Sequence, residues 1–229
     1  MIYCMSNIYG NFLSYSTLLR MINFCEDDTL YVLGDVVDYG DENMRVLLDM
    51  MKRPNVIPIL GEHDFMAYHS LNWLYYGDHN DEREMEKYEN WLASGGAATV
   101  FEFRELSRND KDAALSYLGQ FSLYREISVN GRDFVLIHKA PRVFSPEKPL
   151  SSYSRDDILS GNTDYEKVYF PDKYLVTGHT PTREIFAKSD GLTIDTVFVR
   201  NNHIATACGG KFDQLLSAIC LDTFEDYYA

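Results

Sequence analysis

Four apolar runs along the chain each end abruptly in a polar, glycine-containing loop. The runs and their loops are IYCMS before NIYGN, TLYVL before GDVVDYG, NVIPIL before GEHDF, and KYLVT before GHTPT. A short apolar run bounded by turn residues is typical of a buried strand. The pattern therefore predicts four strands that each deliver a polar loop at the carboxyl end.

Apolar residues at helical spacing separate the first three runs. One such face contains Phe12, Tyr15, Leu19 and Ile22, and the next contains Met44, Leu47, Leu48 and Met51. Because residues three and four apart share one face of a helix, each set predicts an amphipathic helix. The opening third of the chain is thus expected to form a βαβαβ unit.

Residues 65–120 change in character and are expected to form a helical insertion between core strands. Within them, the acidic segment 78–89 is best explained as a solvated helix face, although it could bind a basic partner. Residues 139–172 show no periodicity, contain four prolines and are expected to form a long surface loop, a type of segment that often has a function.

Period-two patterns predict antiparallel strands in the second half. YREISV and RDFVLIH flank Asn130-Gly131, a hairpin turn signal, and the segments around Asn201-Asn202 have the same character. Parallel strands followed by antiparallel ones predict an α/β (α+β-like) fold of two mixed β-sheets, packed as a sandwich and flanked by helices. We expect residues 1–229 to form one domain, with a doubly wound single sheet as the weaker alternative.

Composition narrows the class of protein. The chain is 45% hydrophobic and 14% aromatic, which favours a globular fold, and its formal net charge of −14 argues against nucleic acid as a partner. It has neither a span of membrane length nor a basic, apolar leader at its N-terminus, so we predict a cytoplasmic location and no membrane partner. The four cysteines lack CxxC spacing and are expected to be reduced, three of them in apolar surroundings.

Carboxylates and imidazoles follow the predicted strands closely. They are Asp35, Asp38, Glu62, His63, Asp64, His138 and His179. Any one of them could be an ordinary polar residue, but carboxylate and imidazole together form the ligand set of zinc, manganese or iron. The set predicts a metal site on the rim where the strands end.

In order along the chain, GDVVDYG, GEHD, IH and GHT resemble the motifs of the calcineurin-like metallophosphoesterases, most closely those of the bacterial serine/threonine protein phosphatase type. The resemblance covers nearly the whole chain, including the closing GGKFDQLLSAICLD. It implies hydrolysis of a phosphoester by a metal-activated water, with a small-molecule or phosphoprotein ligand.

The resemblance also assigns roles. Asp35 matches the carboxylate that bridges two metal ions, and His138 and His179 match ligands of the second ion, whose asparagine ligand is replaced by Glu62. His63 and Asp64 match the dyad that protonates the leaving alkoxide.

Several positions depart from the family pattern. Asn7 and Tyr9 stand where the first loop usually supplies an aspartate and a histidine to the first metal, and an amide and a phenol are poor substitutes. Tyr39 and Asn162 stand where arginines usually grip phosphate, and Ala207 stands where an aspartate is common. We therefore expect one divalent ion (Mn, Zn or Fe), no second metal, and activity that is weak or absent.

Three hypotheses remain open. The chain could be a hydrolase with one ion held by Asp35, Glu62, His138 and His179, or a pseudoenzyme that survives as a binding module. In the third, evolution or engineering has rebuilt the pocket for other chemistry, with Lys139 as a Schiff-base amine or Glu62 as a base whose pKa is raised by burial. Against the Lys139 alternative, most lysines in loops are simply solvated.

Overall fold

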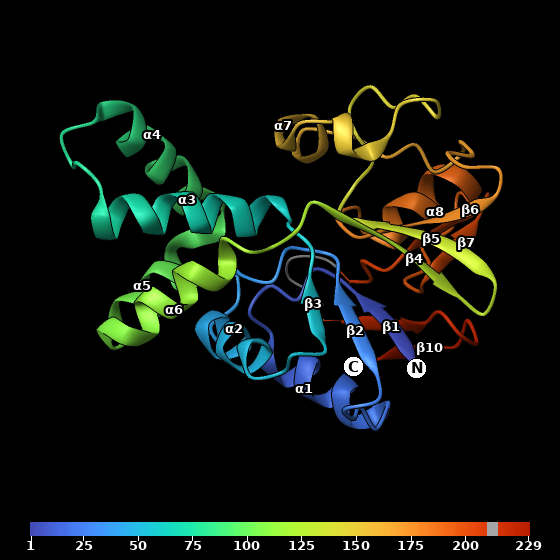
Figure 1. The fold of residues 1–229 in the computed structure, drawn as a ribbon, viewed down its shortest axis with the longest axis horizontal. Coiled ribbons are helices and arrows are strands. Elements are labelled where there is room, and N and C mark those ends of the chain that lie inside the picture. The colour runs from blue at the N-terminus through green and yellow to red at the C-terminus, as the bar shows by residue number, and fades with distance from the viewer. Residues whose placement is uncertain (210–214) are drawn as a thin grey trace.

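The computed structural model describes residues 1–209 and 215–229 and contains two mixed sheets flanked by helices (Figure 1). The order of the first sheet is β10 (Asp226–Tyr228), β9 (Ser217–Cys220), β1 (Ile2–Met5), β2 (Thr29–Val32), β3 (Val56–Pro58). The order of the second is β4 (Tyr124–Val129), β5 (Arg132–Ile137), β6 (Lys173–Thr177), β8 (His203–Ala205), β7 (Phe198–Arg200). The expected fold class is confirmed. Residues 210–214, part of the closing segment GGKFDQLLSAICLD, lie outside the described residues.

The four apolar runs form the strands β1, β2, β3 and β6, each of which pairs in parallel with a neighbour. β1, β2 and β3 pair in parallel, and α1 (Phe12–Met21) and α2 (Asn43–Met51) connect them. In the second sheet β5, β6 and β8 are parallel, whereas β4 pairs antiparallel with β5 and β7 antiparallel with β8. The opening βαβαβ unit is therefore confirmed, as are the hairpin turns at Asn130-Gly131 and Asn201-Asn202, whose φ angles are all positive.

Alternation of side chains divides the core into layers. In β1, Tyr3 and Met5 face the helices, while Cys4 faces the second sheet and packs with Phe134 and Val176. Successive residues of a strand point to opposite faces, so a strand buried on both sides is apolar throughout. The sandwich core lies between the sheets, and a second core lies beneath the helices.

Residues 139–172 differ from the surface loop that the sequence suggests. They contain a short 3₁₀ turn (Leu150–Ser152) and α7 (Arg155–Leu159). The segment buries Leu150, Tyr153, Ile158 and Tyr169 with side chains of β5 and β6. The expectation was wrong because these apolar residues follow no regular period, yet they converge once the chain folds back over the second sheet.

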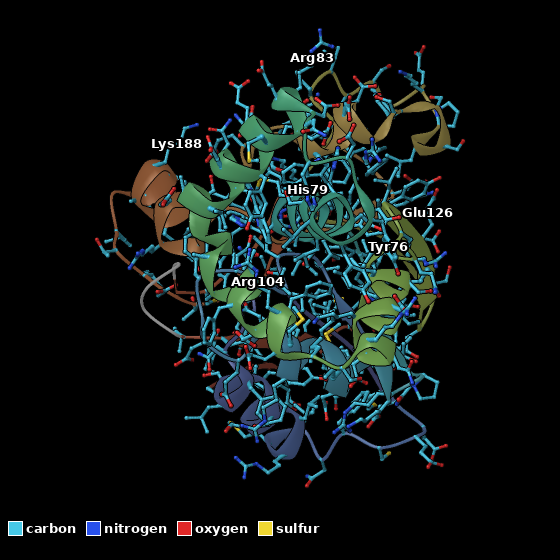
Figure 2. All side chains as sticks on the ribbon, turned by 90° about the vertical axis from the view of Figure 1, so that its left-hand side faces the viewer. Tyr76, His79, Arg83, Arg104, Glu126 and Lys188 are labelled. Carbon is cyan, nitrogen blue, oxygen red and sulfur yellow. The ribbon has the colours of Figure 1, made fainter. Side chains whose placement is uncertain are left out.

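Four helices lie between β3 and β4. They are α3 (Glu62–Tyr76), α4 (Glu82–Trp91), α5 (Ala97–Glu105) and α6 (Arg108–Leu118), with a π-helical segment at Leu92–Gly96 between α4 and α5. Figure 2 shows α4 and α5 descending along this side of the molecule, from Arg83 at the top to Arg104 lower down. No helix within residues 1–209 and 215–229 is long and apolar enough to cross a bilayer.

Three of the four cysteines, Cys4, Cys208 and Cys220, are buried, and Cys25 is exposed. All four are free thiols, as the spacing predicted.

Candidate functional site

The loops that follow the parallel strands meet at one cavity of about 890 Å³. Asn7 follows β1, Asp35 follows β2 and Glu62 follows β3, while His179 and Ala207 follow strands of the second sheet, and all five line the cavity. Parallel strands present their carboxyl ends at the same edge of a sheet, so loops distant in sequence converge there.

The backbone of these loops is unusually constrained. Among the described residues other than glycine, eleven have positive φ, and six of these belong to the site: Asn7, Tyr9, Asp35, Asp38, Tyr39 and His179. A positive φ is uncommon outside glycine, asparagine and aspartate, and residues held this way concentrate at functional sites. The loops thus hold their side chains in fixed directions at a cost in conformational energy.

Asp35, His138 and His179 form a compact donor set, whose candidate ligand atoms all lie within 4.8 Å of one another. The Nδ1 of His138 contacts the carbonyl oxygen of Leu33 at 2.6 Å, which orients the ring so that Nε2 lies 3.4 Å from Oδ2 of Asp35. This Nε2 atom is buried and has no hydrogen-bond partner. One carboxylate and two imidazoles fit a single zinc, manganese or iron ion, and such an ion would satisfy the orphaned nitrogen.

Electrostatics support the same assignment. Burial raises the pKa of Asp35, but the neighbouring imidazoles, His138 foremost, outweigh it and hold this pKa well below its usual range. Burial lowers the pKa of His138, and the Asp35 carboxylate more than reverses this. Asp35 therefore stays ionised in a buried place, and the positive charge that it attracts there could equally be that of a metal ion.

Glu62 lies next to the donor set but is engaged by the side-chain nitrogens of two neighbours. Its Oε2 lies 2.9 Å from Nδ1 of His179 and 2.7 Å from Nζ of Lys139, a buried lysine. Burial raises the pKa of Glu62, but the bonds from His179 and Lys139 prevail and lower it to about 2. The hypothesis of a Glu62 base with a pKa raised by burial is therefore wrong. Glu62 is an ionised carboxylate that borders the donor set through His179.

The other half of the site does not fit a metal ion. The Tyr9 hydroxyl donates to Oδ2 of Asp35 at 3.0 Å and accepts from Nδ2 of Asn7 at 3.0 Å. The Asn7 Oδ1 accepts from the His179 backbone amide at 2.9 Å. Burial, and next the charge of Asp35, raise the pKa of the Tyr9 phenol, which favours the protonated donor over a phenolate ligand. The polar atoms of Asn7 and Tyr9 thus bond to one another and to the loops.

His63 is paired with a different aspartate from the one that the motif suggested. Its Nδ1 lies 2.8 Å from Oδ2 of Asp38, whereas Asp64 accepts backbone N–H bonds from Asp35, Val36 and Gly61. The pairing of His63 with Asp64 is therefore wrong. The side chains of consecutive residues at the start of a helix point in different directions, and the Asp64 carboxylate, at the N-terminus of α3, accepts hydrogen bonds from backbone amides instead.

The His63 imidazole has a raised pKa. Burial lowers this pKa, but the bond to Asp38 and the charge of Asp35 outweigh burial. A protonated imidazole that lines a cavity beside a donor set can supply a proton to a departing group. Geometry and charge together make His63 the candidate general acid.

The remaining altered positions also surround the cavity. Asn162 and Ala207 line it, as does Tyr39. The rings of Tyr9, Tyr39 and His63 meet edge to face, with centroids 5.0 to 5.4 Å apart. One wall of the cavity is therefore aromatic.

Sequence reasoning missed two kinds of residue. Arg183 lines the cavity four residues after His179, and the string GHTPTR was the only signal for it. Trp91 and Thr99, from α4 and α5, both bond to Asp38, and nothing in their local sequence marks them.

Comparison with known proteins gives a consistent picture. A sequence profile described as calcineurin-like phosphoesterase matches residues 2–183. A curated relative, the symmetrical bis(5'-nucleosyl)-tetraphosphatase of Acidovorax ebreus (strain TPSY), is 29% identical over 139 residues, which is 60% of this chain and 43% of the relative. The match thus spans less than half the length of that protein.

Solved structures agree in fold. A crystal structure of a candidate diadenosine tetraphosphatase matches with a TM-score of 0.67 at 15% identity, covering 100% of this chain and 92% of that one. The hypothetical protein PH1004 from Pyrococcus horikoshii OT3 matches with a TM-score of 0.51 at 15% identity, covering 100% of this chain and 87% of that one. At these identities the likeness concerns the fold alone.

Proposed function

Since the chain belongs to the calcineurin-like phosphoesterase family, we propose that it hydrolyses the phosphate ester of a small organic molecule with the help of one divalent metal ion. The observation that carries the proposal is the donor set of buried Asp35, buried His138 and partly exposed His179, with its unpartnered His138 nitrogen, beside the His63–Asp38 pair. Members of both groups, Asp35 and His179 of the first and His63 of the second, line the same cavity.

The chemistry divides between the ion and the chain. When bound, a divalent ion supplies Lewis acidity to the phosphoryl group and lowers the pKa of water. The oxygen of a water molecule bonds to phosphorus and this water gives a proton to solvent, while the bond from phosphorus to the ester oxygen breaks and His63 gives its proton to the departing alkoxide. His63 then takes a proton from solvent for the next turnover. Asp38 holds the His63 ring in place, and Arg183 offers positive charge to the phosphate from the cavity wall.

The substrate class rests on the relatives. The curated relative is a tetraphosphatase of bis-nucleosyl compounds, which favours a nucleotide-like phosphoester for this chain. The serine/threonine phosphatase likeness and a phosphoprotein ligand stay predictions. The Lys139 amine has less support, because its Nζ is held by Glu62 at 2.7 Å and Lys139 is not among the described residues that line the cavity.

Metal content and turnover test the proposal together. We expect one equivalent of Mn²⁺, Zn²⁺ or Fe²⁺ by elemental analysis, and hydrolysis of p-nitrophenyl phosphate and of diadenosine tetraphosphate. His138→Ala should lose both metal and turnover. His63→Asn should keep the metal and lose turnover of esters whose leaving group is an alkoxide.

A matched control is His79→Asn, which changes an exposed histidine between α3 and α4 (Figure 2) and should change neither the metal content nor the turnover. A protein that takes up no metal and hydrolyses neither compound would instead support the binding-module hypothesis. Borohydride trapping of a carbonyl compound that disappears in Lys139→Ala would support amine catalysis.

A further inference from the structure

The helices between β3 and β4 contact the candidate acid pair directly. Asp38 is fully buried, and its carboxylate accepts two hydrogen bonds besides its contact with His63. Trp91, the last residue of α4, donates from Nε1 to Oδ2 at 2.8 Å. Thr99, in α5, donates from Oγ1 to Oδ1 at 2.7 Å, and the same hydroxyl accepts from the Asp38 amide at 3.1 Å.

These two donors hold the Asp38 carboxylate in one orientation, because each of its oxygens accepts one of the two hydrogen bonds. Trp91 is 1% exposed and Thr99 is fully buried, so water cannot replace either bond. When both oxygens are held in place, the lone pairs of the Asp38 carboxylate point toward His63 Nδ1 in a single direction. The direction of the His63 ring, and hence of the proton at its other nitrogen, then depends on the insertion.

Local geometry around residues 92–96 explains how one insertion delivers both donors. The π-helical segment lets the chain turn between α4 and α5, and Gly95 has a φ of +109°. A Cβ on Gly96 would lie 2.3 Å from the Trp91 ring, so only glycine leaves room for it. The Tyr39 amide bonds to the Gly95 carbonyl at 3.0 Å, which joins this turn to the GDVVDYG loop.

A second contact anchors the insertion to the same loop. The carboxylate of Glu102, on α5, accepts from the backbone amides of Asn43 and Met44 at 2.9 and 2.8 Å. The loop from Asp35 to α2 is therefore held by α5 at its far end and by Trp91 and Thr99 at Asp38.

We propose that Trp91 and Thr99 are positioning residues that act through Asp38 on the His63 acid, so that the helical insertion determines how well the enzyme expels poor leaving groups. The inference rests on the proposed function and adds to it the residues that align its proton donor. Neither residue contacts the substrate in this scheme.

Leaving-group dependence separates positioning from a general structural role. An alkoxide such as that of glycerol 2-phosphate needs a proton to depart, whereas p-nitrophenolate departs readily without one. Trp91→Phe and Thr99→Val each remove one donor with little change in shape. Each should lower kcat/KM for glycerol 2-phosphate about tenfold more than for p-nitrophenyl phosphate.

Conservative and matched variants complete the experiment. Thr99→Ser keeps the hydroxyl and should restore the wild-type ratio of the two esters. Trp73→Phe removes the other indole donor of the chain, which bonds to the Asp78 carbonyl in the same insertion, and should leave the ratio unchanged. Equal losses on both esters in Trp91→Phe and Thr99→Val would overturn the inference while leaving the hydrolase intact. Hydrolysis of neither ester by the unaltered chain would overturn both proposals.

Discussion

Restoring the first metal site is the perturbation that the structure specifies most sharply. Asn7→Asp together with Tyr9→His supplies a carboxylate and an imidazole beside Asp35. The double variant should bind two equivalents of Mn²⁺, and the unaltered chain one. The reason is that the Tyr9 hydroxyl, which now donates to Asp35, is exchanged for a ligand.

The single variant Asn7→Asp should behave differently, and its cost follows from two contacts and one added charge. The Asn7 amide nitrogen donates to Tyr9 at 3.0 Å and lies 3.4 Å from the His179 carbonyl oxygen, and a carboxylate can donate to neither. It also adds a negative charge near Asp35. Leaving partly buried groups unpaired costs about 1–3 kcal/mol, so the melting temperature of the metal-free protein should fall by roughly 2–12 °C.

Elemental analysis, Mn²⁺ titration calorimetry and thermal melts measure these effects. Added Mn²⁺ should restore the stability of the double variant, because an ion that binds only the folded state stabilises it by about 2.7 kcal/mol at a hundred times its Kd. The reasoning is refuted if the double variant still binds one equivalent, or if Asn7→Asp alone binds two. Adding Tyr39→Arg to the double variant should then raise phosphatase turnover.

Three further predictions concern separate parts of the molecule. Burial lowers the pKa of His203 to about 3, below the ordinary histidine pKa of about 6.5 in the unfolded chain. The contribution of this group to the free energy of unfolding should therefore be largest above pH 6.5 and fall by about 2 kcal/mol from pH 7 to pH 5. Urea titrations should show this loss in the unaltered chain and not in His203→Gln. Gly95→Ala should destabilise by about 2–4 kcal/mol, because its φ is +109° and a Cβ would lie 2.7 Å from the Tyr39 ring. Lys139→Met should tighten Mn²⁺ binding by about tenfold, because it removes a buried cation and frees Glu62 for the ion.

Controls for these predictions exist within the chain. Gly131 also has positive φ, but its Cβ would meet nothing within 4 Å, so Gly131→Ala should cost only about 1 kcal/mol. Lys173→Met removes a surface partner of Glu126 and should not change Mn²⁺ affinity. Equal losses in the two glycine variants, equal affinities in the two lysine variants, or an unchanged pH slope in His203→Gln would each contradict the corresponding argument.

The pattern of apolar and polar residues predicted strands correctly where apolar residues form a continuous run. The runs before NIYGN, GDVVDYG, GEHDF and GHTPT became the parallel strands β1, β2, β3 and β6, because a strand buried on both faces must be continuously apolar. The pattern failed to predict the burial of residues in 139–172, because the buried Leu150, Tyr153 and Ile158 follow no regular period. Their burial depends on a surface that only the folded second sheet provides.

The chain sequence by itself determined which loops meet at the cavity, because each polar loop follows a strand and parallel strands end at one edge. It could not determine which side chains pair there. His63 and Asp64 are neighbours in sequence, yet His63 bonds to Asp38 while Asp64 bonds to backbone amides. Likewise Lys139 lies in a loop, where lysines are usually solvated, yet it is buried against Glu62.

Spacing along the chain records the order of elements but not the direction of a side chain. That direction depends on loop backbones with positive φ at Asn7, Tyr9 and Asp35, and on donors from distant helices such as Trp91 and Thr99. The sequence alone thus predicted a metal site with altered ligand positions at the rim of a sandwich. Only the tertiary structure decided that one half of this site is closed by a tyrosine hydroxyl, while the other presents a buried, unsatisfied histidine nitrogen.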